Sequence, residues 1–183
     1  MGDMHEFQRH WALHYGGRVL NVGCKDDPAN LRTIPGVVQI DKLSHDSFTN
    51  KNLNTLAGFI NIDMFDYTPE EPFDVVVLGE FLEHCTEEMF HKVIKQTVSF
   101  IKEGGVLILT TPQDGRDKYA NHGPDESKYY EISPGIVSWH QLYITKEMLE
   151  DDLQNNNMTI ITYEFRHWLS GVNTHCIVAR REK

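Results

Sequence analysis

The sequence predicts a doubly wound α/β fold, with a mostly parallel seven-stranded sheet and an antiparallel hairpin at its C-terminal end. Short apolar runs rich in β-branched residues alternate along the chain with amphipathic stretches of helical period. Continuous runs of this kind are typical of parallel strands that are covered on both faces. Only residues 166–174 separate the last two runs, and a parallel pair needs a crossover of about a dozen residues or more. We therefore expect these two strands to pair antiparallel.

The elements follow in order from the N-terminus. A helix is expected near residues 4–14, and strands are expected at 18–23, 37–41, 59–62, 74–79, 105–111, 158–165 and 175–180. The clearest helix covers 86–105, where Thr86 is a good N-cap and Gly104 a stop. Its apolar stripe consists of Phe90, Val93, Ile94, Val98 and Ile101. A further helix at 145–155 begins at Thr145 and places Met148, Leu149 and Leu153 on one face.

The length of 183 residues predicts a single domain, 1–183, in which residues 1–17 form a helical cap. Residues 112–139 form a long irregular insert directly after the central strand 105–111. Long loops in compact domains are usually functional, and ligands of open α/β sheets bind at the carboxyl ends of strands. The insert is therefore expected to form a lid or one wall of a substrate pocket.

Composition limits the classes of partner. The net charge of -10 argues against a surface built to hold nucleic acid. No run approaches the roughly 20 apolar residues of a membrane helix, and the N-terminus has no signal-peptide core. Three cysteines at wide spacing, Cys24, Cys85 and Cys176, argue against a disulfide framework and indicate a reducing, cytoplasmic setting. The sequence does not indicate an oligomeric state.

A glycine and three acidic residues stand where the predicted strands end. Gly23 follows the first strand, Asp41 ends the second, and Asp63 and Glu80 follow the third and fourth. Each alone has a plainer reading, such as a turn glycine, a helix cap or a surface carboxylate. Together at one edge they predict a nucleoside cofactor, because the carboxylate of Asp41 can accept hydrogen bonds from both hydroxyls of its ribose. The acidic rim repels pyrophosphate and no G-x-G-x-x-G is present, so a nicotinamide-dependent oxidoreductase is disfavoured.

A family resemblance rests on the blocks VLNVGCKDDP, VVQID, FDVVVLGEFLEHC, GGVLILTTP and WHQLYITKEML. Over roughly residues 18–165 this order resembles the class I S-adenosylmethionine-dependent methyltransferases, and the E-x-L-E-H block is similar to that of ubiquinone-pathway O-methyltransferases. The resemblance implies a Rossmann-like fold, S-adenosylmethionine as cofactor and a small-molecule acceptor with an O, N or C nucleophile. The family commonly has an acid where Asn21 stands and glycines where Lys25 and Asp27 stand. A non-catalytic cofactor-binding module, acting as a partner or regulator, is therefore the alternative.

The resemblance also assigns roles to residues. It places Asp41 on the ribose, Asp63 and the backbone of Met64 on the adenine, and Glu80 near the sulfonium. The full set of implied cofactor contacts is Asn21, Gly23, Cys24, Asp41, Lys42, Asp63, Met64, Glu80 and Phe81.

Catalytic candidates for activating the acceptor are Glu83, His84 and His140. For the later histidine of a possible metal site, His122 is the second choice to His140. Glu80, Glu83 and His84 lie within one helical turn, and together with His140 they form a set that could hold a divalent metal. We rank a metal-free role for these residues above metal binding.

Overall fold

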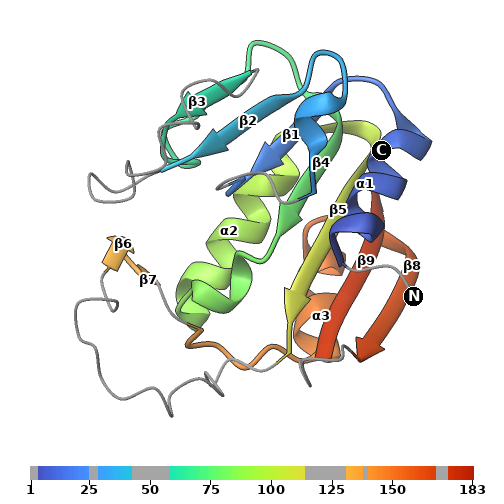
Figure 1. Ribbon diagram of the computed structural model, residues 1–183. Coiled ribbons are helices and arrows are strands. Elements are labelled where there is room, and N and C mark those ends of the chain that lie inside the picture. The colour runs from blue at the N-terminus through green and yellow to red at the C-terminus, as the bar shows by residue number, and fades with distance from the viewer. Residues whose placement is uncertain (1–3, 25–28, 43–57, 114–130, 138–139, 168–172) are drawn as a thin grey trace.

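The computed structural model describes residues 4–24, 29–42, 58–113, 131–137, 140–167 and 173–183. It confirms the predicted fold class: seven strands form one sheet in the order β3-β2-β1-β4-β5-β9-β8 (Figure 1). Neighbouring strands from β3 to β5 are parallel, and β9 is antiparallel to both β5 and β8. The strands are β1 (Val19–Val22), β2 (Val38–Asp41), β3 (Phe59–Asn61), β4 (Phe73–Gly79), β5 (Ile101–Pro112), β8 (Met158–His167) and β9 (Asn173–Arg181).

The helices are α1 (Met4–Tyr15), α2 (Glu87–Ser99) and α3 (Lys146–Asn155), and short 3-10 turns η1 (Leu31–Thr33) and η4 (Leu82–His84) follow β1 and β4. The two predicted N-caps are confirmed, because the hydroxyls of Thr86 and Thr145 accept hydrogen bonds from the first helical turns. The predicted end of the helix at 86–105 is wrong. The helix ends at Ser99 because Ile101 already pairs with Phe73 as the first residue of β5.

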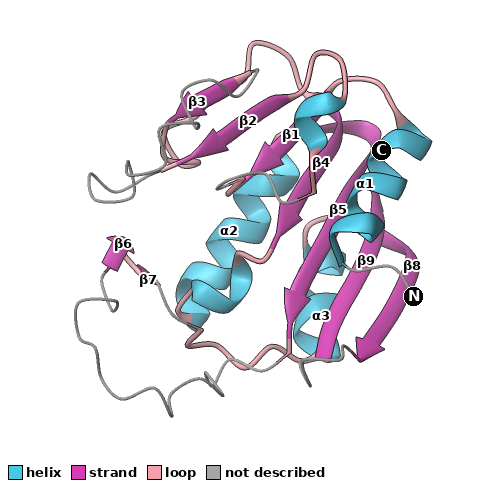
Figure 2. Cartoon of the chain, viewed as in Figure 1, coloured by secondary structure: helices cyan, strands magenta, loops and turns pink. Residues whose placement is uncertain are grey.

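Helices cover both faces of the sheet, which explains why its strands are apolar without alternation. On β4, Val76 and Leu78 belong to the core shared with α2 and α3, whereas Val75 and Val77 belong to the core shared with α1 and η1. Figure 2 shows α1 on one side of the sheet and α2 and α3 on the other. Within the described residues, no helix is long and apolar enough to cross a membrane.

The insert expected at 112–139 is described only in part. Residues 114–130 and 138–139, among them His122, lie outside the described residues. The strands β6 (Glu131–Ser133) and β7 (Ile136–Val137) form a small antiparallel pair. The amide of Thr86 donates to the carbonyl of Gly135 at 2.9 Å, so this pair is attached to the start of α2. A lid or wall function of the insert stays a prediction, as does the single domain over 1–183.

Candidate active site

Gly23 and the three acidic strand-end residues come together at one edge of the sheet. Asp41 is the last residue of β2, and Gly23 and Glu80 directly follow β1 and β4, while Asp63 lies just beyond β3. Because β1 to β4 are parallel neighbours, these ends share the carboxyl edge. Gly23 has φ +64°, and a Cβ built on it would lie 2.3 Å from the ring of Phe81. The turn therefore needs glycine both for its backbone and for the packing of Phe81.

Two of the residues assigned to the cofactor are joined by an ion pair. Lys42 Nζ lies 3.0 Å from Asp63 Oδ2, and Asp63 Oδ1 accepts a hydrogen bond from the amide of Phe65 at 3.0 Å. These contacts fix the loop after β3 against the end of β2. Met64, which follows Asp63, is buried and its carbonyl accepts from the side chain of Gln96 at 3.4 Å. The backbone at Met64 is thus held in place by α2.

Asn21 lies inside the sheet, two residues before the glycine turn. It pairs in register with Gln39 of β2, and its amide donates to Gln39 Oε1 at 3.4 Å. Both side chains are buried, as is Cys24 on the far side of Gly23. Sequence reasoning did not single out Gln39, although a glutamine inside the apolar run VVQID was a visible signal.

Glu80 occupies an uncommon environment. Its φ is +54°, in the left-handed region that non-glycine residues seldom adopt, and its amide donates to the carbonyl of Thr110 at 2.9 Å. Its Oε1 is inaccessible to water and has no hydrogen-bond partner among the described residues. Burial raises the pKa of Glu80 to about 7, and a hydrogen bond from the Thr110 hydroxyl acts in the opposite direction. Strain and an unpaired buried oxygen together are typical of functional positions.

The three predicted catalytic residues form one cluster. Glu83 lies on η4 and is completely buried, with Oε2 accepting a hydrogen bond from Thr111 Oγ1 at 3.1 Å. Its Oε1 lies 3.8 Å from Nε2 of His84 and 3.9 Å from Nε2 of His140. The two imidazole rings are 4.9 Å apart and nearly perpendicular. Both histidines are partly exposed, whereas the carboxylate between them is not.

Backbone hydrogen bonds bring His140 to this cluster. The amides of Gln141 and Leu142 both donate to the carbonyl of Glu83, at 2.8 and 3.2 Å. The side-chain amide of Gln141 donates to the carbonyl of His84 at 3.0 Å. The segment after the insert therefore forms hydrogen bonds with η4. Neither the sequence around Glu83 nor the sequence around His140 indicated this contact.

Burial raises the pKa of Glu83 well above its usual range, and the nearby Glu80 carboxylate raises it further. One carboxylate and two imidazoles from Glu83, His84 and His140 place a donor atom each within 4.8 Å of one another. Such a mixed set can hold zinc, manganese or iron. Glu80, the fourth residue of the predicted metal set, does not belong to this group of donor atoms.

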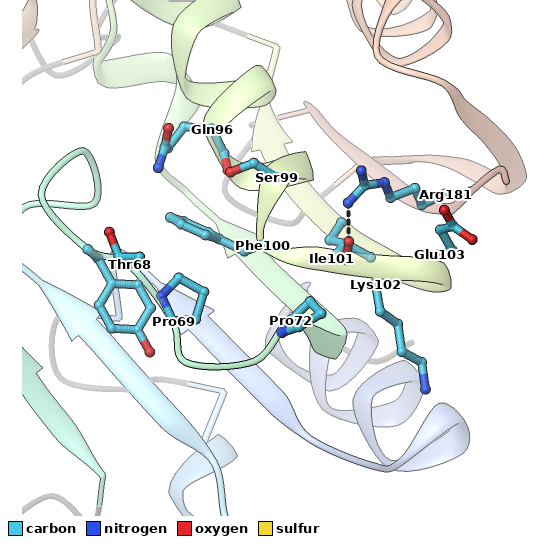
Figure 3. A pocket seen from close by; sticks show the side chains of 11 residues that line it. Thr68, Pro69, Pro72, Gln96, Ser99, Phe100, Ile101, Lys102, Glu103 and Arg181 are labelled. Carbon is cyan, nitrogen blue, oxygen red and sulfur yellow. Dashed lines mark hydrogen bonds between the residues drawn. The ribbon is translucent and has the colours of Figure 1, made fainter.

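A cavity of about 520 Å³ lies at the opposite edge, where β4 and β5 begin and β9 ends (Figure 3). Tyr67 and Phe100 form an aromatic wall, and the guanidinium of Arg181 donates to the carbonyls of Val98 in α2 and Ile101 at the start of β5. Its described lining includes none of the residues that the sequence assigned to a site. This cavity was not predicted.

No protein-family model and no curated protein matches the chain, but solved structures do. The N-methyltransferase NodS from Bradyrhizobium japonicum WM9 matches 98% of this chain and 94% of its own, with a TM-score of 0.68 and 14% identity. A second match is the 1,6-didemethyltoxoflavin-N1-methyltransferase from Burkholderia thailandensis, whose structure contains 1,6-didemethyltoxoflavin and S-adenosylhomocysteine. It matches 98% of this chain and 78% of its own, with a TM-score of 0.69 and 14% identity. The fold is that of the class I methyltransferases.

Class I architecture does not by itself determine the reaction. The [4+2]-cyclase SpnF also matches, over 97% of this chain and 80% of its own, with a TM-score of 0.64 and 14% identity. Structures named as methyltransferases and one named as a cyclase thus share this class I fold. The activity must be argued from the residues at the carboxyl edge.

Proposed function

We propose that the chain is an S-adenosylmethionine-dependent methyltransferase that acts on a small molecule through an O, N or C nucleophile. The observation that carries the proposal is the buried Glu83 Oε1 at the carboxyl edge of a class I sheet: it has no hydrogen-bond partner among the described residues and lies 3.8 and 3.9 Å from the Nε2 atoms of His84 and His140. The 1,6-didemethyltoxoflavin bound in the Burkholderia thailandensis neighbour supports a small-molecule acceptor by analogy. The finer likeness to ubiquinone-pathway O-methyltransferases rests on the GEFLEHC block.

The edge residues fit the cofactor. The inaccessible Oε1 of Glu80, which has no hydrogen-bond partner among the described residues, suits a positively charged group, and the glycine turn at Gly23 lets the ring of Phe81 pack against it. Asp41 would hold the ribose hydroxyls, and Asp63 with the backbone of Met64 would contact the adenine. Asn21, Cys24, Lys42 and Phe81 would complete the contacts. When bound, S-adenosylmethionine supplies an electrophilic methyl group on a sulfonium.

The remaining task of the chain is to orient the acceptor and remove its proton. His140 is the more exposed of the two histidines, with 37% of its side chain accessible against 25% for His84. Its Nε2 can take a proton from an acceptor hydroxyl or amine. The imidazolium that results would lower the raised pKa of Glu83 and favour the carboxylate form beside it. A divalent metal held by Glu83, His84 and His140 would lower the pKa of a bound hydroxyl instead. The metal-free role stays first in our ranking.

A cofactor-binding module without catalysis is the second candidate. It is favoured by Asn21, because the resemblance expects an acid at this position and the structure has a neutral amide bonded to Gln39. An amide supplies no countercharge to an ammonium group. The module would bind the cofactor and transfer nothing.

The first test is calorimetric titration with S-adenosylhomocysteine, with and without Mn²⁺. We expect the wild type to bind and Asp41→Ala to lose about tenfold or more in affinity, equivalent to about 1.4 kcal/mol. Asp151→Ala removes the same charge from an exposed position on α3 and should bind as the wild type does. Absence of binding by the folded wild type would contradict the proposal, and affinity that depends on Mn²⁺ would reverse our ranking of the metal.

Catalysis is tested with methyl-labelled S-adenosylmethionine and a cell extract separated by size. Transfer of label to the small-molecule fraction is expected for the wild type and should be lost in His140→Asn, while cofactor affinity remains. Label in nucleic acid or protein would contradict a small-molecule acceptor. Binding without any transfer would favour the non-catalytic module.

A further inference from the structure

A buried histidine on β9 lies beside the candidate active site and has no place in the proposed chemistry. His175 is 1% exposed and pairs in register with Thr111 of β5. Thr111 is the residue whose hydroxyl donates to Glu83. His175 is thus close to the catalytic cluster and yet shielded from any substrate.

The hydrogen bonds of His175 select one form of its ring. Its Nε2 lies 3.1 Å from the carbonyl oxygen of Ile144, which can only accept, so Nε2 carries the hydrogen. Burial lowers the pKa of His175, which keeps the ring neutral. Nδ1 then accepts from the hydroxyl of Tyr163 at 2.8 Å. The ring is held from two sides by β8 and by the segment after the insert.

Ile144 is the last residue before the N-cap of α3 and belongs to the segment that carries His140. Both backbone polar groups of Ile144 are hydrogen-bonded. Its amide donates to the carbonyl of Gln113 at 3.2 Å, and its carbonyl accepts a hydrogen bond from Nε2 of His175. The other end of the segment is attached to η4 through Gln141 and Leu142. Without His175, the buried carbonyl of Ile144 would lose the donor that the structure provides.

We propose that His175 is a positioning residue of the candidate active site: it anchors Ile144 to β9 and thereby holds the segment 140–144, with His140, against Glu83. The proposal rests on the proposed function insofar as His140 activates the acceptor. His175 itself touches no reacting atom. Its effect on the reaction passes through the backbone of the segment.

The test compares His175→Leu, which lacks both hydrogen bonds, with His175→Gln, whose side-chain amide can still donate to Ile144. Hydrogen exchange of the amides of Gln141, Leu142 and Ile144 is the main measurement. In His175→Leu we expect protection there to fall about tenfold or more, as loss of a buried hydrogen bond predicts. In His175→Gln it should stay near the wild-type value. His167→Leu removes an exposed histidine from β8 and should change nothing.

The amide of Phe90 within α2 serves as the internal reference, because a general loss of stability would lower its protection too. Carbethoxylation of His140, followed by mass spectrometry, should become faster in His175→Leu only. Unchanged protection of the segment, or an equal loss at Phe90, would overturn the proposal. If His175→Leu does not fold, Tyr163→Phe removes only the hydroxyl that orients the ring, and a selective loss at Ile144 is then the expected result.

Titration with S-adenosylhomocysteine separates the two proposals. His175→Leu should bind it as the wild type does, because the proposed cofactor contacts lie at and beyond the carboxyl ends of β1 to β4, and His175 lies on β9. A wild type that fails to bind would refute the proposed function, while the exchange measurement would still decide the role of His175. A fall in cofactor affinity equal to the fall in protection would show a general disturbance and overturn the positioning role.

Discussion

Glu80 has both an unfavourable backbone conformation and a buried carboxyl oxygen without a hydrogen-bond partner among the described residues. A left-handed backbone in a non-glycine residue costs on the order of 1–3 kcal/mol, and the buried unpaired oxygen adds to that cost. A glycine would remove the strain and an apolar residue would remove the unpaired oxygen. Retaining a carboxyl here is understandable if the site receives a positively charged group, which would lower the pKa of Glu80 on binding.

Glu80→Gln should change how stability depends on pH. The folded pKa of about 7 lies above the ordinary value of 4.5, so the native state keeps a proton that the unfolded state has released between these values. This contribution is fully present below about pH 4.5 and is lost as the pH rises through 7, with a total of about 3 kcal/mol at 1.36 kcal/mol per unit.

Urea unfolding at pH 5 and pH 8 measures the effect. Glu80→Gln should lose less stability than the wild type between these two pH values, whereas Glu182→Gln, at an exposed position, should follow the wild type. If Glu80→Gln and the wild type lost the same free energy of unfolding between pH 5 and pH 8, this result would contradict the raised pKa of Glu80.

At the scale of residues, the sequence predicted the ionisable residues of the candidate site. It did not predict the residues that hold the site in position through hydrogen bonds. Glu80, Glu83 and His84 stand within one short block, so their proximity could be read directly. Thr111 and His175 could not be found in this way, because their contacts to Glu83 and Ile144 join distant parts of the chain through the pairing of β5 with β9. No local pattern encodes that register.

At the scale of elements, the side chain of Gln8 attaches α1 to the end of β5 beside the site. The amide of Gln8 donates to Thr110 Oγ1 at 2.6 Å, and both residues are buried. The same amide fills the space above Gly79, where an added Cβ would lie 2.1 Å from Gln8 Nε2. Gly79 has an ordinary backbone conformation, so the requirement for glycine comes from the helix that packs on it.

Gly79→Ala should therefore be costly only while Gln8 is present. Displacing Gln8 from Thr110 should lower the free energy of unfolding by about 1–3 kcal/mol. In a Gln8→Ala background the same change should be close to neutral, which makes the two substitutions non-additive. Urea unfolding of the four proteins in this cycle measures the coupling.

Gly105→Ala is the matched control, because its added Cβ would meet the backbone of Asp74 and not Gln8. Its cost should be the same in both backgrounds. If Gly79→Ala were equally costly with and without Gln8, the close approach of α1 would not be the reason for this glycine.

Element boundaries were predicted well where local chemistry determines them and poorly where pairing does. The hydroxyls of Thr86 and Thr145 cap their helices as their sequences indicate. The end of α2 was missed because Gly104 is a strong local stop, whereas the pairing of Ile101 with Phe73 is a long-range event. The β8–β9 hairpin was predicted because its short connection excludes the alternative.

At the scale of the whole molecule, the sheet joins two cores that lie on opposite faces. The core under α2 and α3 carries η4 and the segment with His140, whereas the core under α1 lies against the other face of the same strands. Thr110 and Thr111 are adjacent on β5 and contact Gln8 and Glu83 respectively, one on each face. The two cores therefore support the same site, and we expect them to unfold together.

Phe7→Ala tests whether the two cores unfold together, because Phe7 is 3% exposed on α1 and belongs to the core on that face. Removing a buried aromatic ring should cost about 3–5 kcal/mol. If the chain is one cooperative domain, this loss should lower the urea midpoint of the whole sheet in a single transition. Circular dichroism and tryptophan fluorescence should then report the same midpoint.

Leu13→Ala provides the comparison on the same helix, since Leu13 is 54% exposed and its truncation should change stability by no more than about 0.5 kcal/mol. Two separate transitions in Phe7→Ala, with the sheet keeping its wild-type midpoint, would mean that α1 is a detachable cap. The hydrogen bond from Gln8 to Thr110 argues for the single transition, because it ties the helix to the end of the central strand at the position where the candidate active site begins.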